Sequence, residues 1–499
     1  MSVCPRQLLP TNAWVRRALV PVLVFVALVT DQNYLADFWH HLARGRAIVD
    51  EGRVVNEDRF TFTVPGRQFQ DVNWLSQVGY HALFEMGGLD LVRAVNALTL
   101  AAALALLTWL CQRHSGSLGM ATTVGVLTFF GLWNVLTIRP QTYSLLLFVA
   151  LYAVLDAAER RPRWLWLAPP ILALWANLHG AFPAGVMLIG CFGAAAAWDA
   201  WRRGNGVFCD RQTRLLGLSL AASLVATLAN PYGWGIYFYV GLTSNTAAAR
   251  QIDEWVLPSL ADWIGVAFFV SLGLLAILSV LAWRRCGRKP SARELCLLGC
   301  FLPLACGSVR MVAWWLLIIA PVLAELLVAV FPRRAEDADD ERAPSTGAAV
   351  VFGVMVLAVI FCLPGLRTYN PLLRVSRDGP RVEDDLEAVH RHLQVHAGAG
   401  RIFSRFEWGE YLGWSGAPHF KVFMDGRIEI YPDEVWERYA AVTRGLAGWD
   451  RILDDYRVDF LLLDSTYHAR TGLLRQVEQS SVWREAFRVR DAILYVRRA

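Results

Sequence analysis

Long apolar runs separated by short polar connections occupy the first 370 residues of the chain. Most of these runs approach the roughly 20 residues that an α-helix needs to cross a bilayer, which predicts a bundle of membrane-spanning helices. The runs 164–178 and 181–200 are separated by so few residues that they could also form one broken helix. The run 294–307 is the shortest. The pattern predicts about eleven spans, at 14–31, 91–111, 118–138, 141–158, 164–178, 181–200, 214–230, 262–283, 294–307, 311–331 and 347–366.

After residue 370 the apolar runs become short and alternate with polar segments, which is typical of a water-soluble domain. Strands are predicted at 401–406, 421–426, 460–464 and 492–498. Helices are predicted at about 382–396, 432–443, 449–456 and 467–481. This alternation favours a small α/β domain. We therefore expect a polytopic α-helical membrane domain over 1–370, with a long first loop at 32–90, and a soluble α/β domain over 371–499.

The basic residues are concentrated in alternate loops, and the short loops between them hold only isolated arginines, Arg139, Arg250 and Arg310. The positive-inside rule places the basic loops and the N-terminus in the cytoplasm. With an odd number of spans, the loop 32–90 and residues 371–499 then lie outside. The connections on the basic side are at 6–17, at Arg113, and at 160–163, 202–214, 284–293 and 333–342.

The composition agrees with a membrane protein that carries some soluble mass. Of 499 residues, 55% are hydrophobic and 18% are charged, and the mean hydropathy is +0.36. The 21 tryptophans fit anchoring at the membrane interface. The net charge of +5 is modest, and we expect no nucleic-acid partner. The nine cysteines follow no spacing that predicts a disulfide framework.

Polar residues gather in the connections on the predicted outer side. Such groups cost several kcal/mol at membrane depth unless they are paired or face a cavity, so their convergence on one side predicts a site. The candidates are Asp37, His40, His41 and Asp71 in the first loop, Arg139 and Gln141 in one connection, Asn177 and His179 in the next, Asn230, Tyr232 and Glu254 in a third, and Arg310 in a fourth.

Each candidate also has a structural explanation. The arginines could bond helix-terminal carbonyls or lipid phosphates, and Asn177 with His179 could cap a helical turn. The segment that begins at Asn230 could be a turn alone. On a helix, His40 and His41 point about 100° apart and do not suit a shared metal. Asp37 could be a solvated loop acid.

Two segments of the first loop have amphipathic helical patterns, at 37–52 and 72–88. An amphipathic helix beside a membrane span commonly lies in the interface. We therefore expect both helices to lie on the outer membrane surface and to hold Asp37 at the level of the lipid head groups.

Several segments carry a resemblance to known proteins: "ADFWHHLARGRAIVDEG", "DVNWLSQ", "IRPQ", "WANLHGAF", "NPYG" and "FEWGEYLGW". Together they resemble a family of bacterial polytopic membrane proteins. That family is similar to the GT-C superfamily of membrane glycosyltransferases, near the protein mannosyltransferases and the aminoarabinose transferases.

The resemblance implies transfer of a sugar from a polyprenyl-phosphate donor to an acceptor on the outer face of the bacterial cytoplasmic membrane. Asp37 matches the loop aspartate that acts as base, and Asp71 is a second candidate acid. Arg139 and Arg310 would bind the donor phosphate, and the remaining polar candidates would bind substrate. Related sequences often carry Asp-x-Asp-x-Trp, but this chain has Leu35 at the first of these positions. A requirement for a divalent metal therefore stays open.

Two other functions are consistent with the sequence. One is a transporter or lipid-handling protein, and the other is a non-catalytic subunit of a cell-envelope complex. A transporter should show a matching set of polar residues toward the cytoplasmic side, and often internal repeats. The sequence suggests neither, which favours an enzyme whose partners are a lipid-linked sugar donor and membrane lipids. The donor sugar and the acceptor are not identified by the sequence.

Overall fold

The computed structural model describes residues 10–31, 36–249, 255–332, 344–366, 369–370 and 382–498. The chain divides into two compact units. The first contains the residues up to Asp31, Gly87–Val240 and Ala248–Asn370. The second contains Gln32–Met86, Gly241–Ala247 and the residues from Pro371 on. The long first loop and the C-terminal residues thus belong to one compact unit, although almost 300 residues separate them in the sequence.

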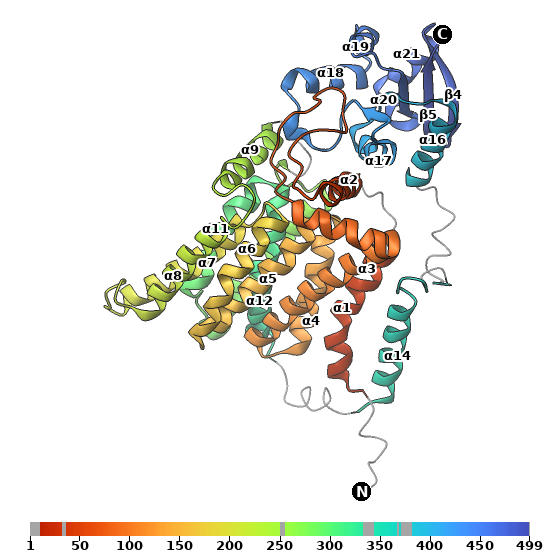
Figure 1. Cartoon of the computed structure of the whole chain (residues 1–499). Helices are drawn as coiled ribbons and strands as arrows, with labels where there is room; N and C mark the ends of the chain where they lie inside the picture. The colour runs from red at the N-terminus through yellow and green to blue at the C-terminus, as the bar shows by residue number, and fades with distance from the viewer. Residues whose placement is uncertain are drawn as a thin grey trace. The chain divides into compact units, whose positions relative to one another are not determined.

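The first unit is a set of packed helices (Figure 1). Helix α3 (Trp74–Ser115) belongs to it from Gly87 onward. Helix α9 (Gly235–Ala249) was not predicted as a separate element, and its residues are divided between the units. The other helices are α1 (Asn12–Thr30), α4 (Leu118–Leu132), α5 (Gln141–Ala158), α6 (Ala168–Leu178), α7 (Pro183–Arg202), α8 (Arg211–Ala226), α10 (Trp263–Cys286), α11 (Ala292–Gly307), α12 (Val312–Val330) and α14 (Thr346–Ile360).

Local sequence explains where several of these helices begin and end. The hydroxyl of Ser117 accepts a hydrogen bond from the Met120 N–H and caps α4. Helix α11 begins with a capping box between Ser291 and Glu294. Helix α10 ends at Gly287, whose φ of +67° suits glycine.

Each predicted span has a helix at its place, but the predicted number of eleven spans is not confirmed. Seven of the described helical segments are long and apolar enough to cross a membrane. The helices α6, α8, α11 and α14 are shorter than 18 residues. The runs 164–178 and 181–200 form separate helices, because the chain leaves the helix at His179 and begins α7 at Pro183.

The second unit is built around a five-stranded sheet with the strand order β2-β1-β3-β5-β4 (Figure 1). The strands are β1 (Gly400–Phe403), β2 (Phe420–Val422), β3 (Phe460–Asp464), β4 (Trp483–Val489) and β5 (Ala492–Arg497). Strand β1 pairs in parallel with β2 and β3, whereas β5 pairs antiparallel with β3 and β4. The predicted small α/β sheet domain is therefore present.

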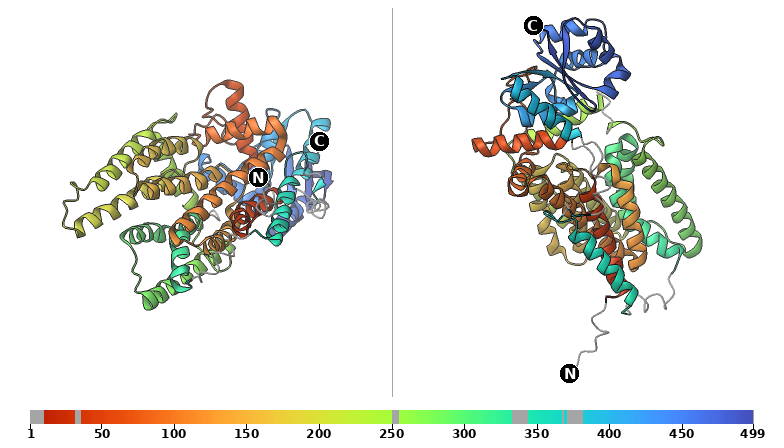
Figure 2. Two further views of the ribbon diagram at one scale, coloured as in Figure 1. Left: turned by 90° about the horizontal axis from the view of Figure 1, so that it is seen from below. Right: turned by 90° about the vertical axis from the view of Figure 1, so that its right-hand side faces the viewer.

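Helices surround this sheet, and Figure 2 gives two further views of them. They are α16 (Val382–His396), α17 (Phe406–Gly416), α18 (Asp433–Thr443), α19 (Trp449–Asp455), α20 (Ser465–Thr471) and α21 (Leu473–Gln479). The core includes Phe403, Phe423 and Leu461, and also Val64 and Phe69 from the first loop. The first loop thus contributes part of the hydrophobic core of the C-terminal domain.

The first loop also lies along the β2 edge of the sheet. The Phe62 N–H donates to the Val422 carbonyl (3.2 Å), and the Val422 N–H donates to the Phe60 carbonyl (3.1 Å). The Thr63 hydroxyl donates to the Phe423 carbonyl (2.7 Å). These bonds satisfy backbone groups that an edge strand would otherwise expose.

Protein covers the apolar face of helix α2 (Ala36–Glu51), and the expected position of this helix on the membrane surface stays a prediction. The Trp39 ring lies 4.9 Å from the Tyr411 ring and 4.6 Å from the Trp414 ring of α17, between centroids. The Phe38 ring packs against Tyr80 in the first part of α3 at 5.8 Å. The amphipathic pattern was correct, but its partner is an aromatic helix of the same unit and not lipid.

Candidate functional site

The first turn of α2 presents the predicted catalytic carboxylate. Asp37 lies there half-buried, and an acid in the first turn suits the positive end of a helix dipole. His40 lies three residues later, so it shares a face of the helix with Asp37. Its Nδ1 is 3.3 Å from the Glu410 Oε2 of α17.

Glu410 brings a second carboxylate to this face from the C-terminal domain. Its side chain is buried, with only 2% of the residue exposed. A Cβ at position 426 would stand 1.9 Å from the Glu410 Oε1 and 3.8 Å from the Asp37 Oδ1, so both oxygens lie close to Gly426. A side chain at position 426 would therefore displace the Glu410 carboxylate from its present position. Two carboxylates and an imidazole therefore gather at the start of α2.

A second, buried set of polar groups fixes α2 against the start of α3. The Arg44 Nη2 is 2.5 Å from the Asp71 Oδ2, and the Gln77 Nε2 donates to the Asp71 Oδ1 (2.9 Å). The same Gln77 nitrogen lies 3.1 Å from the His41 Nδ1. Burial raises the pKa of Asp71, and Arg44 and Gln77 offset that effect only in part. Asp71 is 1% exposed, so a substrate hydroxyl does not reach it without a rearrangement.

A third network joins the first loop to the C-terminal domain. The Arg427 Nη2 lies 2.5 Å from the Asp58 Oδ1 and 2.6 Å from the Asp425 Oδ2. The Tyr431 hydroxyl donates to the Asp425 Oδ1 (2.8 Å). Burial alone would raise the pKa of Asp425, but Arg427 and Tyr431 outweigh it and hold that pKa below its usual value. This network is structural, and it fixes the loop that precedes Asp71.

The predicted phosphate ligands Arg139 and Arg310 belong to the first unit. Arg139 is half-buried and precedes α5, and Arg310 is half-buried and precedes α12. The Arg310 guanidinium lies 5.5 Å from the centre of the Trp255 ring.

The two helices run in the same direction, which places both arginines at one end of the first unit. The Phe148 ring of α5 packs 5.0 Å from the Trp314 ring of α12. Further along each helix, Asp156 and Glu325 both contact His114, at 2.7 and 2.8 Å. At 1.5 Å per residue, the arginines stand roughly 20 Å or more from His114.

Several predicted substrate ligands are engaged by the protein itself. The Asn177 Nδ2 donates to the Ala173 and Ala229 carbonyls, at 2.8 and 2.7 Å. The His179 Nδ1 lies 2.7 Å from the Ser144 hydroxyl. Asn230 accepts a hydrogen bond from the Tyr232 N–H (2.7 Å) within a turn, and Gln141 donates to the Val135 carbonyl (3.1 Å). Their substrate-binding role stays a prediction, and Glu254 lies outside the described residues.

Several buried charged residues were not among the predicted site residues, and Arg93, Glu410 and Arg427 are three of them. Arg93 is 6% exposed, and its Nη1 donates to the Asp31 carbonyl. The sequence feature that could have indicated Arg93 is a single charged residue at the start of an apolar run. Glu410 and Arg427 lie in "FEWGEYLGW" and "MDGRIEIY", which carried the resemblance but gave no indication of burial.

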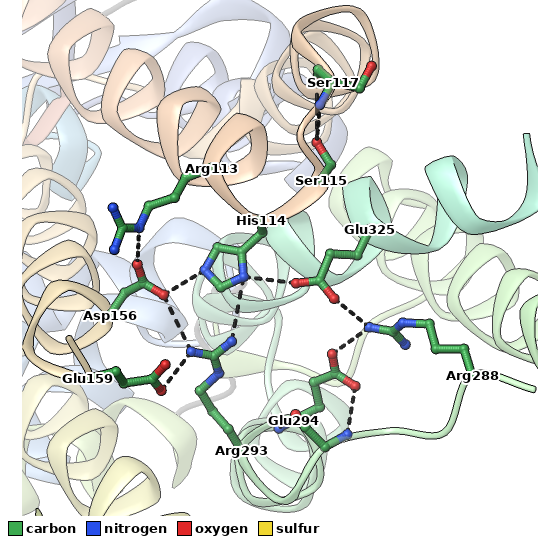
Figure 3. A network of polar contacts seen from close by, with 11 residues as sticks. Arg113, His114, Ser115, Ser117, Asp156, Glu159, Arg288, Arg293, Glu294 and Glu325 are labelled. Carbon is green, nitrogen blue, oxygen red and sulfur yellow. Dashed lines mark hydrogen bonds and ion pairs between the residues drawn. The ribbon is translucent and has the colours of Figure 1, made fainter. Parts of the chain in front are cut away.

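The expectation that the chain lacks polar residues toward the basic side of the membrane helices is also wrong. A network of charged residues lies there, around His114, Asp156 and Glu325 (Figure 3). These groups contact each other at helix ends and form fixed ion pairs. Among the described residues, no three His, Cys, Asp or Glu side chains are placed together as metal ligands would be.

Comparison with known proteins supports the predicted fold. No family model matches the chain, and no curated protein sequence matches it. Among solved structures, the chain is similar to the oligosaccharyltransferase of Archaeoglobus fulgidus in its apo form. The TM-score is 0.59 at 10% sequence identity, over 90% of this chain and 69% of the other. At this identity the likeness concerns the fold alone.

Proposed function

We propose that this protein is a membrane glycosyltransferase of the GT-C kind. It transfers a sugar from a polyprenyl-phosphate donor to an acceptor on the outer face of the bacterial cytoplasmic membrane. The observation that carries the proposal is a half-buried carboxylate, Asp37, in the first loop of a chain whose fold matches an oligosaccharyltransferase. The short, basic loops are cytoplasmic in this proposal, and the second unit is outside.

The reaction displaces a phosphate from the anomeric carbon of the sugar. The Asp37 carboxylate accepts the proton of the acceptor hydroxyl, whose oxygen forms the new bond to the anomeric carbon. The bond from that carbon to the phosphate oxygen breaks, and its electron pair leaves with the polyprenyl phosphate. Arg139 and Arg310 bind the phosphate, since a guanidinium offers a planar fork of donors to an oxyanion.

The residues around Asp37 hold it in place in this proposal. Glu410 orients His40 at 3.3 Å, on the helix face that Asp37 shares. Asp71 acts as a structural anchor for α2 because it is buried and paired with Arg44. Asp71 is therefore not proposed as a catalytic base.

The test is sugar transfer in proteoliposomes that contain the full-length protein, a radiolabelled polyprenyl-phosphate sugar and membranes as the source of acceptor. The variant Asp37→Asn should lower the rate by about 10²–10⁴, the range expected for a positioned acid–base group. Asp50→Asn is the matched control, because Asp50 is exposed on the same helix. Activity of Asp37→Asn within about threefold of the wild type would remove Asp37 from the mechanism.

A further inference from the structure

A groove of about 430 Å³ lies at the basic end of the first unit, between α10, α11 and α12. Its walls include Leu272, Leu275, Ala276 and Leu298, and Lys289 lies at its edge. The volume falls within the range of about 300–1,000 Å³ that is typical of small-molecule sites. The groove is therefore a largely apolar slot whose charged end is formed by Arg288, Lys289 and Glu294.

The groove is open to the lipid side of the bundle. On α10, Ile277 and Val280 are 60% and 48% exposed, as expected for lipid-facing side chains. Trp283 lines the groove and is itself 59% exposed. A tryptophan next to arginine at the end of a span marks the depth of the lipid head groups. The mouth of the groove thus lies at head-group level, and its apolar part extends toward the hydrocarbon core.

The charge network beside the groove engages some of the nearby cations (Figure 3). The Arg288 Nη2 lies 2.6 Å from the Glu294 Oε1 and 2.7 Å from the Glu325 Oε2. The Arg293 Nη1 lies 2.9 Å from the Glu159 Oε1. These pairs hold the segment at the edge of the groove in place. They also neutralise the carboxylates of Glu159, Glu294 and Glu325.

Two other cations nearby, one in the last turn of α10 and one in the loop that follows it, are not engaged in this way. Arg284 and Lys289 are exposed, and neither makes an ion pair with any residue in the described part of the chain. A largely apolar slot with the exposed Lys289 at its edge, and Arg284 in the adjoining last turn of α10, is complementary to a molecule with acyl chains and one negative head group. Basic pockets between membrane helices are known to bind anionic lipid head groups.

We propose that this groove is a binding site for an anionic diacyl phospholipid. One acyl chain lies along α10 between Leu272 and Trp283, a length of roughly 16 Å at 1.5 Å per residue. The phosphodiester lies at Lys289 and Arg284. The site is at the opposite end of α12 from Arg310, so it is separate from the proposed donor site and does not depend on sugar transfer.

The test is native mass spectrometry of the full-length protein, titrated with phosphatidylglycerol and with phosphatidylcholine of the same acyl chains. The wild type should retain one phosphatidylglycerol in preference to phosphatidylcholine. A surface cation contributes about fivefold to affinity for an anionic lipid, so Arg284→Gln with Lys289→Gln should weaken phosphatidylglycerol about 25-fold. Phosphatidylcholine binding should not change.

Matched variants distinguish binding in the groove from non-specific attraction between anionic lipid and the basic loops of the protein. Arg202→Gln with Arg211→Gln removes two exposed arginines from another basic loop and should leave binding within twofold. Ala276→Phe fills the groove and should weaken both lipids. If the double variant at 284 and 289 does not fold, Lys289→Gln alone should weaken phosphatidylglycerol about fivefold.

Three results would overturn the proposal. The first is equal retention of both lipids by the wild type. The second is unchanged phosphatidylglycerol binding in the variants at 284 and 289. The third is displacement of phosphatidylglycerol by an equal concentration of polyprenyl phosphate, which would assign the groove to a carrier lipid.

Discussion

Replacement of Arg427 by methionine tests whether the first loop and the C-terminal domain depend on one buried cation. Arg427 is 3% exposed and faces two carboxylates, Asp58 from the loop and Asp425 from the domain. Methionine preserves much of the volume and removes the charge. Both carboxylates would then be buried without their cation.

The magnitude follows from the burial of the partners. The side chains of Asp58 and Asp425 are 0% and 4% exposed, so water does not replace the guanidinium. Removing one partner of a buried ion pair typically costs about 3–5 kcal/mol of folding stability. Since about 1.4 kcal/mol corresponds to a factor of ten, the opening equilibrium of the second unit should rise by about 10²–10³·⁵.

Amide hydrogen exchange of the full-length protein measures this opening directly. The informative amides are those of Phe62 and Val422. The Phe62 N–H donates to the Val422 carbonyl, and the Val422 N–H donates to the Phe60 carbonyl, so both hydrogen bonds connect the loop to the sheet. Their exchange should accelerate by the factor given above. The matched control is Arg391→Met, because Arg391 pairs with Glu387 at the surface, where a salt bridge contributes about 0–1 kcal/mol.

The pH dependence gives an independent check of the same reasoning. In the wild type the pKa of Asp425 is lowered, so its contribution to stability is present above the unfolded pKa and is lost as the pH falls through the folded pKa. In Arg427→Met, burial without the cation should raise the pKa of Asp425 instead. The variant then regains stability as the pH falls from that raised pKa toward the unfolded pKa of about 4, and the difference from wild type narrows over this range and further as the wild type loses its own contribution at lower pH. Acceleration under tenfold at pH 7, or a difference that widens in acid, would refute the argument.

Other predictions follow from the site and the topology. Glu410→Gln should lower the rate of sugar transfer and shift its pH profile, whereas the exposed Glu387→Gln should do neither; an unchanged pH profile would leave Glu410 with a packing role only. Arg139→Lys should weaken transfer by losing the bidentate geometry, and Arg139→Ala should weaken it more, mainly through donor binding; equal activity of both variants and wild type would return Arg139 to a helix-end cation. Reporter fusions at Gly204 and Gly398 should report the cytoplasm and the outside respectively, and a report of the same side from both would reject the proposed orientation.

Hydrophobic periodicity was sufficient to predict most helices. The predicted span 141–158 coincides with α5, and the predicted helix 382–396 coincides with α16. The predicted helix 467–481 is divided into α20 and α21 because Gly472 has a φ of +86°. Helix α17 was missed because "FEWGEYLGWSG" is rich in glycine and aromatic residues, which are poor helix formers. Strand β4 was missed because much of it is exposed and charged.

A residue of the candidate site could be predicted only where the sequence immediately around it had an unusual pattern. Asp37 lies in a short segment rich in acids and histidines just after the first apolar run, and stood out for that reason. The contact between Asp58 and Arg427 joins residues 369 positions apart, and no local pattern indicates it. Likewise, the amphipathic pattern of α2 specified a face to be buried but not whether lipid or Trp414 would cover it.

The division of the second unit between two distant parts of the chain has a consequence for its biogenesis. The ribosome releases the first loop, with the Asp58 carboxylate and the Phe69 ring, long before it makes Arg427 and Tyr431. At about 5–20 residues per second, the loop waits roughly 20–70 s for the segment that completes its core. During this interval its aromatic face is exposed to the membrane surface and to any chaperone there. A nascent chain that stops before residue 420 would keep its membrane helices but should be recognised by quality-control proteases, since it lacks the sheet residues that bury Val64 and Phe69.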